Sequence, residues 1–456
     1  MEPSDLPAVL DDELRQRREA GYDVSPVLDQ LDRPPREVSP TRARALLDQL
    51  ERLPRRPDWP YVEPSDREGI EAELPPASPP ARPIGNAELR DRIEAAWLGR
   101  CAGNCLGKPV ENGAFWTPER LRHYLELSGN YPIRDYIRRL DPMPEGFELN
   151  PCWTETTKGR VVAAPRDDDL DYTLLGLHLL ETRGFDYTCA DVAEEWLLRL
   201  PYHLTYTAER VTYRNLVNGV EPERAAVVDN PYREWIGAQI RGDVFGYVCA
   251  GRPRDAALLA YQDAVLSHRG NGIYGEMWAA ALVAAAFTAT TLRDAVEESL
   301  RHVPARSRLA EALRWAVEVY DSKVTWEEAR ARLDERYGHY HWVHTINNAV
   351  ACVFGLLYAE DDYTNAIGLT VQAGLDTDSN GGTVGSVAGA FAGRGGIPRH
   401  WTSPFSDTLR SGLFGFDHSS IRDLAERTFA LARTYACQRA QPVSRLDRGD
   451  STSSRS

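Results

Sequence analysis

The 456-residue sequence has no long apolar stretch. Its longest apolar run, residues 277–287, is alanine-rich, whereas a helix needs roughly 20 apolar residues to cross a bilayer. The first residues, Met-Glu-Pro-Ser-Asp, lack the basic and apolar sections of a secretory signal. We therefore expect a protein that neither spans nor binds a membrane.

Positive charge is also scarce. The chain has 53 Lys and Arg residues against 68 Asp and Glu residues, which gives a formal net charge of −15. A nucleic-acid-binding surface needs a stripe of basic residues, so we expect no nucleic-acid partner. A surplus of carboxylates instead suits a protein that holds cations.

The seven cysteines show no metal-binding pattern. Only Cys101 and Cys105 lie close together, and no second pair is present to complete a zinc site. Scattered cysteines in odd number are typical of unpaired thiols in the reducing cytosol, so we expect a cytoplasmic protein.

Alternating strand-like segments are scarce, and the pattern is helical from Asn86 onward. Apolar residues recur every three or four positions in several segments, as on the buried face of a helix. These segments are 170–182, 277–287, 307–320, 346–358 and 364–372. We predict a single compact all-α domain over residues 86–436.

The two flanking segments differ from this domain in composition. Residues 1–85 are rich in Pro, Arg and Asp with short amphipathic stretches, which predicts an extended arm with a helix or two. Whether the arm docks on the domain is left open. Residues 437–456 are polar, with several Ser and Arg, which predicts a disordered tail.

Two series of glycines recur at intervals of four residues. The first is Gly99, Gly103 and Gly107, and the second is Gly381, Gly385, Gly389 and Gly393. Glycine inside a helix costs roughly 1 kcal/mol relative to alanine, so these positions need a compensating gain. Close contact between two backbones provides one, and we predict two tightly crossed helices near the centre of the domain.

Acidic residues cluster at the expected starts of two helices. The first group is Asp167, Asp168 and Asp169, and the second is Asp376, Asp378 and Ser379. One Asp at each start can cap its helix, which is the ordinary explanation. Neighbouring carboxylates repel one another unless a cation intervenes, so capping alone does not account for the clusters. Carboxylate and hydroxyl oxygens favour Mg²⁺ or Mn²⁺ over zinc.

Read in order, several segments resemble motifs of the ADP-ribosylglycohydrolase family. The family's Gly-Asp-Ala-Leu-Gly-x-Pro-x-Glu motif resembles residues 103–111, and its Thr-Asp-Asp-Thr motif resembles residues 167–170. The other matching segments are 237–241, 267–268 and 376–379. Asp167 and Leu170 replace family threonines, and Asn104 replaces an aspartate. The resemblance implies an all-α fold, two Mg²⁺ ions (Mn²⁺ is also compatible) and cleavage of an ADP-ribose C1″ glycosidic bond.

The resemblance also implies the site residues. The expected metal ligands are Asp167, Asp168, Asp169, Asp376, Asp378, Ser379 and Glu111. The expected catalytic residues are Asp168, our first choice to take the proton of the attacking water, then Asp376, with Glu111 gating the cleft. The expected substrate-binding residues are Gly103, Asn104, Gly237, Arg241, Ser267, His268 and Tyr274. Arg241 is expected to compensate the charge of a diphosphate.

Three functions fit these patterns. The first is removal of ADP-ribose from a protein or a small-molecule conjugate. The second is hydrolysis of the N-glycosidic bond of a nucleoside or nucleotide-like metabolite, which is favoured if Arg241 faces solvent. The third is a protein that binds metal and ADP-ribose without catalysis, an alternative motivated by the loss of both threonine hydroxyls at positions 167 and 170.

Overall fold

Helices α5 (Asn86–Gly107) and α20 (Thr377–Gly396) make the most extensive contact between two elements in the computed structural model. A Cβ atom on Gly103 would overlap the carbonyl oxygen of Gly381, so only glycine lets the two backbones approach this closely. This confirms the predicted helix crossing. The regular part of α20 ends at Gly393, whose φ of +66° breaks the helix.

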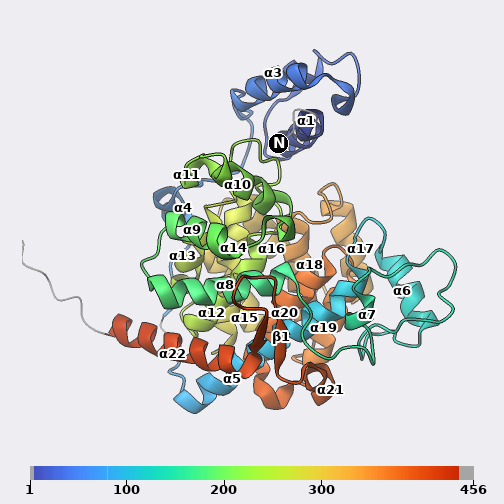
Figure 1. Ribbon diagram of the computed structural model, residues 1–456, viewed down its shortest axis with the longest axis vertical. Helices are drawn as coiled ribbons and strands as arrows, with labels where there is room; N and C mark the ends of the chain where they lie inside the picture. The colour runs from blue at the N-terminus through green and yellow to red at the C-terminus, as the bar shows by residue number, and fades with distance from the viewer. Residues whose placement is uncertain (1–4, 80, 441–456) are drawn as a thin grey trace, which may run out of the picture.

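The structure describes residues 5–79 and 81–440, and helices dominate throughout (Figure 1). The predicted all-α class is confirmed. The five apolar segments form α8 (Asp168–Arg183), α14 (Asn271–Ala286), α16 (Arg308–Asp321), α18 (Thr345–Leu357) and α19 (Tyr363–Gln372). Helix α14 is buried along its whole length, because α12, α13, α15, α18 and α20 all pack against it.

Shorter helices complete the body around this core. They are α6 (Pro118–Leu127), α7 (Trp153–Thr156), α9 (Cys189–Arg199), α10 (Thr207–Val217), α11 (Pro222–Ala225), α12 (Asp243–Val248), α13 (Pro253–Ala264), α15 (Leu292–Ser299), α17 (Trp326–Tyr337), α21 (Arg399–Thr402) and α22 (Ile421–Ala440). The 3₁₀ turns of the body are η3 (Lys108–Val110), η4 (Tyr202–Leu204), η5 (Gln239–Arg241), η6 (Leu300–His302) and η7 (Ser403–Phe405). No helix in the described part of the chain is long and apolar enough to cross a membrane.

Two short strands form the one sheet found among the described residues. Strands β1 (Thr408–Arg410) and β2 (His418–Ser420) pair antiparallel, with Leu409 opposite Ser419. The chain then enters α22, which continues to Ala440. The first residues of the predicted tail are therefore helical, and residues 441–456 lie outside the described residues.

The N-terminal arm (residues 5–79 and 81–85 of those described) is more helical than its proline content predicts. Its helices are α1 (Leu6–Glu19), α2 (Ser25–Leu28), α3 (Pro40–Glu51) and α4 (Arg67–Glu73), with the turn η2 (Pro35–Glu37). Prolines lie in the first turns of α1, α2 and α3, where a missing backbone N–H costs no hydrogen bond. Helices α1 to α3 share a small apolar cluster of their own, above α10 and α11 in Figure 1.

The arm docks on the body through buried polar contacts. The Glu63 carboxylate accepts hydrogen bonds from the Arg308 guanidinium at 2.9 and 3.0 Å. The Arg233 guanidinium donates to the Glu13 carboxylate of α1 at 2.6 and 3.0 Å. Farther along the arm, Ile70 of α4 belongs to the main apolar core. These contacts answer the question that the sequence left open.

Candidate active site at two helix starts

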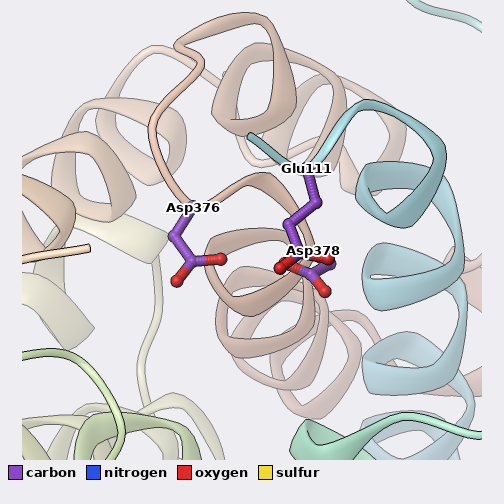
Figure 2. Close-up of side chains that lie close together, drawn as sticks. All are labelled: Glu111, Asp376 and Asp378. Atoms are coloured by element: carbon purple, nitrogen blue, oxygen red, sulfur yellow. The ribbon is translucent and has the colours of Figure 1, made fainter. Parts of the chain in front are cut away.

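The crossing of α5 and α20 brings the first acidic group together. Glu111 follows the 3₁₀ turn η3 at the end of α5, while Asp376 and Asp378 lie at the start of α20. One carboxylate oxygen from each lies within 4.8 Å of the others. Figure 2 shows these three side chains, with Glu111 reaching toward Asp378 beside the first turn of α20.

A second acidic group lies at the start of α8. The Asp167 side chain caps this helix, because its carboxylate accepts a hydrogen bond from the backbone N–H of Asp169 at 3.1 Å. The same oxygen accepts from the Asn104 side-chain amide at 3.0 Å. One oxygen each from Asp167, Asp168 and Asp169 lies within 4.8 Å of the others. Capping therefore occupies only one of the three side chains.

Direct contacts join the two groups. The Ser379 hydroxyl donates to the Asp169 carboxylate at 3.2 Å, which links α20 to α8. The Lys108 ammonium lies 2.8 Å from Asp378 and 2.9 Å from Glu111, and it also contacts Asp167 of the other group. Carboxylates about 200 residues apart in the sequence thus share one site.

The Lys108 ammonium shapes the ionisation of its neighbours. Burial works against its charge, but Asp167, Asp378 and Glu111 hold the pKa of Lys108 well above its ordinary value. Burial also opposes ionisation of Asp167, yet Lys108 keeps the pKa of that carboxyl below its ordinary value. Burial and the Asp378 carboxylate raise the pKa of Glu111 to about 8, against the opposing effect of Lys108.

In three other carboxyl groups of the site, burial and negative neighbours outweigh the nearby cations, which are Lys108 and Arg166 for Asp168 and Arg100 for Asp169. Burial first, and neighbouring carboxylates second, raise the pKa of Asp168, Asp169 and Asp376 well above the ordinary value. Oδ1 of Asp169 and Oδ1 of Asp376 are buried and accept no hydrogen bond from the described residues. Such a set of carboxylate and hydroxyl oxygens fits the preference of Mg²⁺ and Mn²⁺ for hard oxygen ligands.

The acidic residues form the floor of a cleft of about 1370 Å³. The floor consists of Lys108, Glu111, Asp168, Asp169, Asp376, Asp378 and Ser379. Aromatic side chains line the same cleft: Tyr202, Tyr206, Tyr232, Trp235, His341 and Trp342. Carboxylates on the floor and rings beside them suit a ligand with a hydroxyl-rich part and an apolar or aromatic part.

A family model described as ADP-ribosylglycohydrolase matches residues 85–438. The chain belongs to this family. ADP-ribosylglycohydrolases are glycoside hydrolases that act on ADP-ribose conjugates, so the protein is an enzyme of this class. No curated protein matches the chain. A solved structure described as an ADP-ribosylglycohydrolase-related protein complex is 20% identical, and the match covers 76% of this chain and 99% of that chain with a TM-score of 0.46.

The expected substrate-binding residues of this glycohydrolase lie in different places. Gly237 lines the cleft. Gly103 lies in the helix crossing, and Asn104 lies below the floor, where its amide donates to Asp167. The Ser267 hydroxyl and Nδ1 of His268 form a buried hydrogen bond of 2.7 Å. Tyr274 donates its hydroxyl hydrogen to the backbone carbonyl of Pro64, so it holds the arm.

Arg241 does not reach the cleft. Its side chain is only 2% exposed and forms ion pairs with Glu209 at 2.8 Å and Glu276 at 3.3 Å, as well as with Asp263. Three carboxylates therefore surround its guanidinium, and Arg241 is not among the residues that line the cleft. We give Arg241 a structural role in place of the expected contact with a diphosphate.

Sequence reasoning missed two features of this site. Lys108 belongs to a motif that the sequence analysis used, and it is one of only three lysines in the chain. No local signal shows that Lys108 contacts both acidic groups, because this contact forms only once α5, α8 and α20 are packed together. Arg15 and other residues of the arm also line the cleft, although the arm lies outside the family match.

Proposed function

We propose that the protein hydrolyses the C1″ glycosidic bond of an ADP-ribose conjugate in a reaction that depends on Mg²⁺. The convergence of the acidic starts of α8 and α20 supports this proposal most strongly. Asp167, Asp168, Asp169, Asp376, Asp378, Ser379 and Glu111 would hold two Mg²⁺ ions, and Mn²⁺ would also fit these oxygens. Bound divalent ions would polarise the ribose diol and lower the pKa of a bound water.

Asp168 would act as the general base. Its side chain lines the floor of the cleft and stays partly exposed, so a water molecule can reach it. Burial and the adjacent Asp167 raise its pKa above the ordinary value, which makes this carboxylate a stronger base. Asp376 is the second choice, because Oδ1 of this residue is buried without a hydrogen-bond donor.

The substrate would be an ADP-ribosylated protein or a ribosylated small molecule. The aromatic side chains of the cleft would hold the group beyond the ribose. We retain the expectations that nucleic acid is no partner and that the enzyme works in the cytoplasm. Hydrolysis of a nucleoside is the second candidate. Arg241 does not face solvent, contrary to what this alternative expected, but it is buried among three carboxylates and does not line the cleft, so it supplies no charge for a diphosphate.

A substrate screen tests both candidates. The full-length protein is incubated with ADP-ribosyl and ribosyl conjugates, with and without EDTA, and release of the free sugar is followed. We expect release from ADP-ribosyl conjugates and its loss in EDTA. Release of a free base from nucleosides, with no activity on ADP-ribosyl conjugates, would establish the second candidate. Full activity in EDTA would refute the metal dependence.

A further inference from the structure

The N-terminal arm forms part of the cleft. Arm residues that line it are Asp5, Ala8, Val9, Asp12, Arg15 and Arg36. All of them lie outside residues 85–438, the segment that the family model matches. The floor of the cleft thus comes from the family fold, while one part of its wall comes from a segment that this chain adds.

Helix α1 is held firmly against the body beside the cleft. The Gln16 side-chain amide donates to the Glu234 carboxylate at 2.7 Å, and the Tyr232 hydroxyl donates to the Asp12 carboxylate at 2.9 Å. The Arg233 guanidinium binds Glu13. These three contacts lie on one face of α1. All of them reach residues 232–234, which directly precede the cleft residue Trp235. The wall is therefore fixed in place and can position a ligand.

Arg15 is the arginine of this wall that makes no ion pair. Its side chain is exposed, and no carboxylate lies within 4 Å of its guanidinium among residues 5–79 and 81–440. Its charge acts on Glu19, one turn further along α1, and favours the ionised form of that carboxyl. Arg36 differs, because its guanidinium lies 2.7 Å from Asp11 and 3.5 Å from Asp12. In a protein of net charge −15, a cleft guanidinium that makes no ion pair is an attractive site for an anion.

An aromatic platform lies near Arg15. The rings of Trp235 and His341 stack with their centroids 4.3 Å apart and an interplanar angle of 7°. Burial, together with the charge of Arg15, lowers the pKa of His341 to about 4, so this ring is neutral at pH 7. A neutral stacked pair offers a flat apolar face, and the neighbouring guanidinium offers paired N–H donors suited to phosphate oxygens.

We propose that Arg15 binds the diphosphate of the substrate, and that the Trp235–His341 pair receives the attached base. This proposal rests on the proposed function, because the ribose must occupy the acidic floor for the diphosphate to reach the arm. It makes α1 a specificity-determining element, which selects ribosyl substrates that carry a nucleotide over those that end at the ribose.

Calorimetric binding of ADP-ribose, the reaction product, tests this proposal with the full-length protein and Mg²⁺. We expect Arg15→Gln to weaken ADP-ribose binding about tenfold, because a charged hydrogen bond is lost. Binding of adenosine, which has no phosphate, should change less than twofold. Arg18→Gln is the matched control: Arg18 is exposed on the same helix and lies outside the cleft. This control should bind both ligands like the parent protein.

The outcomes separate the two proposals. If the parent protein binds no ADP-ribose, the proposed function fails. If ADP-ribose binds the parent and Arg15→Gln equally, the role of Arg15 is refuted and the proposed function stands. Equal weakening by Arg18→Gln would also refute it, since charge on α1 in general would then explain the effect. In turnover, Arg15→Gln should raise KM and leave kcat within about twofold.

Discussion

Two regions of the molecule place one cation among three carboxylates, yet they serve different ends. Lys108 contacts Asp378 and Glu111 on the floor of the cleft and the buried Asp167 beneath it. In the other region, Arg241 contacts Glu209, Asp263 and Glu276. The Lys108 side chain is 18% exposed, whereas that of Arg241 is 2% exposed. Access to solvent and ligands is therefore the main difference between them.

In the buried cluster, burial favours the protonated form of the carboxyls. It raises the pKa of Glu209 to about 7 and that of Glu276 well above its ordinary value, although Arg241 opposes both shifts. The cluster on the floor also contains carboxyls with raised pKa values, but it opens into the cleft and divalent cations can enter. The comparison teaches that a ring of carboxylates becomes a binding site only where its cations can exchange.

The sharpest way to separate the two regions is to neutralise a carboxylate of the floor. Asp168→Asn and Asp376→Asn should each lower kcat by roughly 10²–10⁴-fold, because a general base or a metal ligand is lost. The helical circular dichroism should stay nearly unchanged. Asp186→Asn, an exposed substitution outside the cleft, is the control. Retained activity in Asp168→Asn would remove this residue from the mechanism.

Removal of the cation of the buried cluster should lower the stability of the fold, whereas the floor substitutions should lower activity. Arg241→Met leaves carboxylates buried without their counter-ion, and we expect a loss of roughly 3–5 kcal/mol in the free energy of unfolding. Urea denaturation measures it. Arg394→Met removes an exposed ion pair with Asp91 and should cost about 1 kcal/mol or less. Similar stability of these two variants would mean that the buried cluster does not hold the fold together.

Removal of the cation of the open cluster should improve metal binding. The Lys108 ammonium lies within 3 Å of oxygens that a divalent ion would bind at about 2.1 Å, so the two compete for the same space. We expect Lys108→Met to bind Mn²⁺ at least about tenfold more tightly, as measured by electron paramagnetic resonance titration. Lys323→Met, at a residue outside the cleft lining, should bind like the parent. Unchanged affinity in Lys108→Met would show that the ammonium does not compete.

A smaller effect concerns the dependence of stability on pH. Burial, and then Arg241, lower the pKa of His268 well below its ordinary value of 6.5. Below pH 6.5 the unfolded chain binds a proton at this residue and the folded chain does not, so folding stability falls as the pH falls. Between pH 7 and pH 5, the decrease in Tm should be smaller for His268→Asn than for the parent protein. The exposed substitution His123→Asn should leave the slope unchanged.

Local signals in the sequence were sufficient for the main helices of the body and for the two acidic clusters. The glycine spacing predicted the crossing of α5 and α20, and repulsion among the carboxylates around Asp168 and Asp376 predicted a shared cation site. The partners of Arg241 could not be predicted in this way. They come from three separate helices, and each acidic residue alone is compatible with a solvated helix face.

The arm shows a second limit of sequence reasoning. Its composition predicted an extended segment with a helix or two, but prolines at helix starts are compatible with further helices. Long-range contacts such as those of Glu13 and Glu63 show where the arm docks. The place of Arg15 in the cleft follows from this docking. A pattern within residues 6–19 alone could not have indicated it.

The glycine contact between α5 and α20 has a consequence for how the active site can vary. Glu111 closely follows one helix and Asp376 immediately precedes the other, so the distance between the two helix axes sets the spacing of these carboxylates. A methyl group at Gly103 or Gly381 would push the axes apart and so change the metal affinity without replacing any ligand. Tolerance to mutation should therefore be lowest at these glycines, although they have no side chain to contact the substrate.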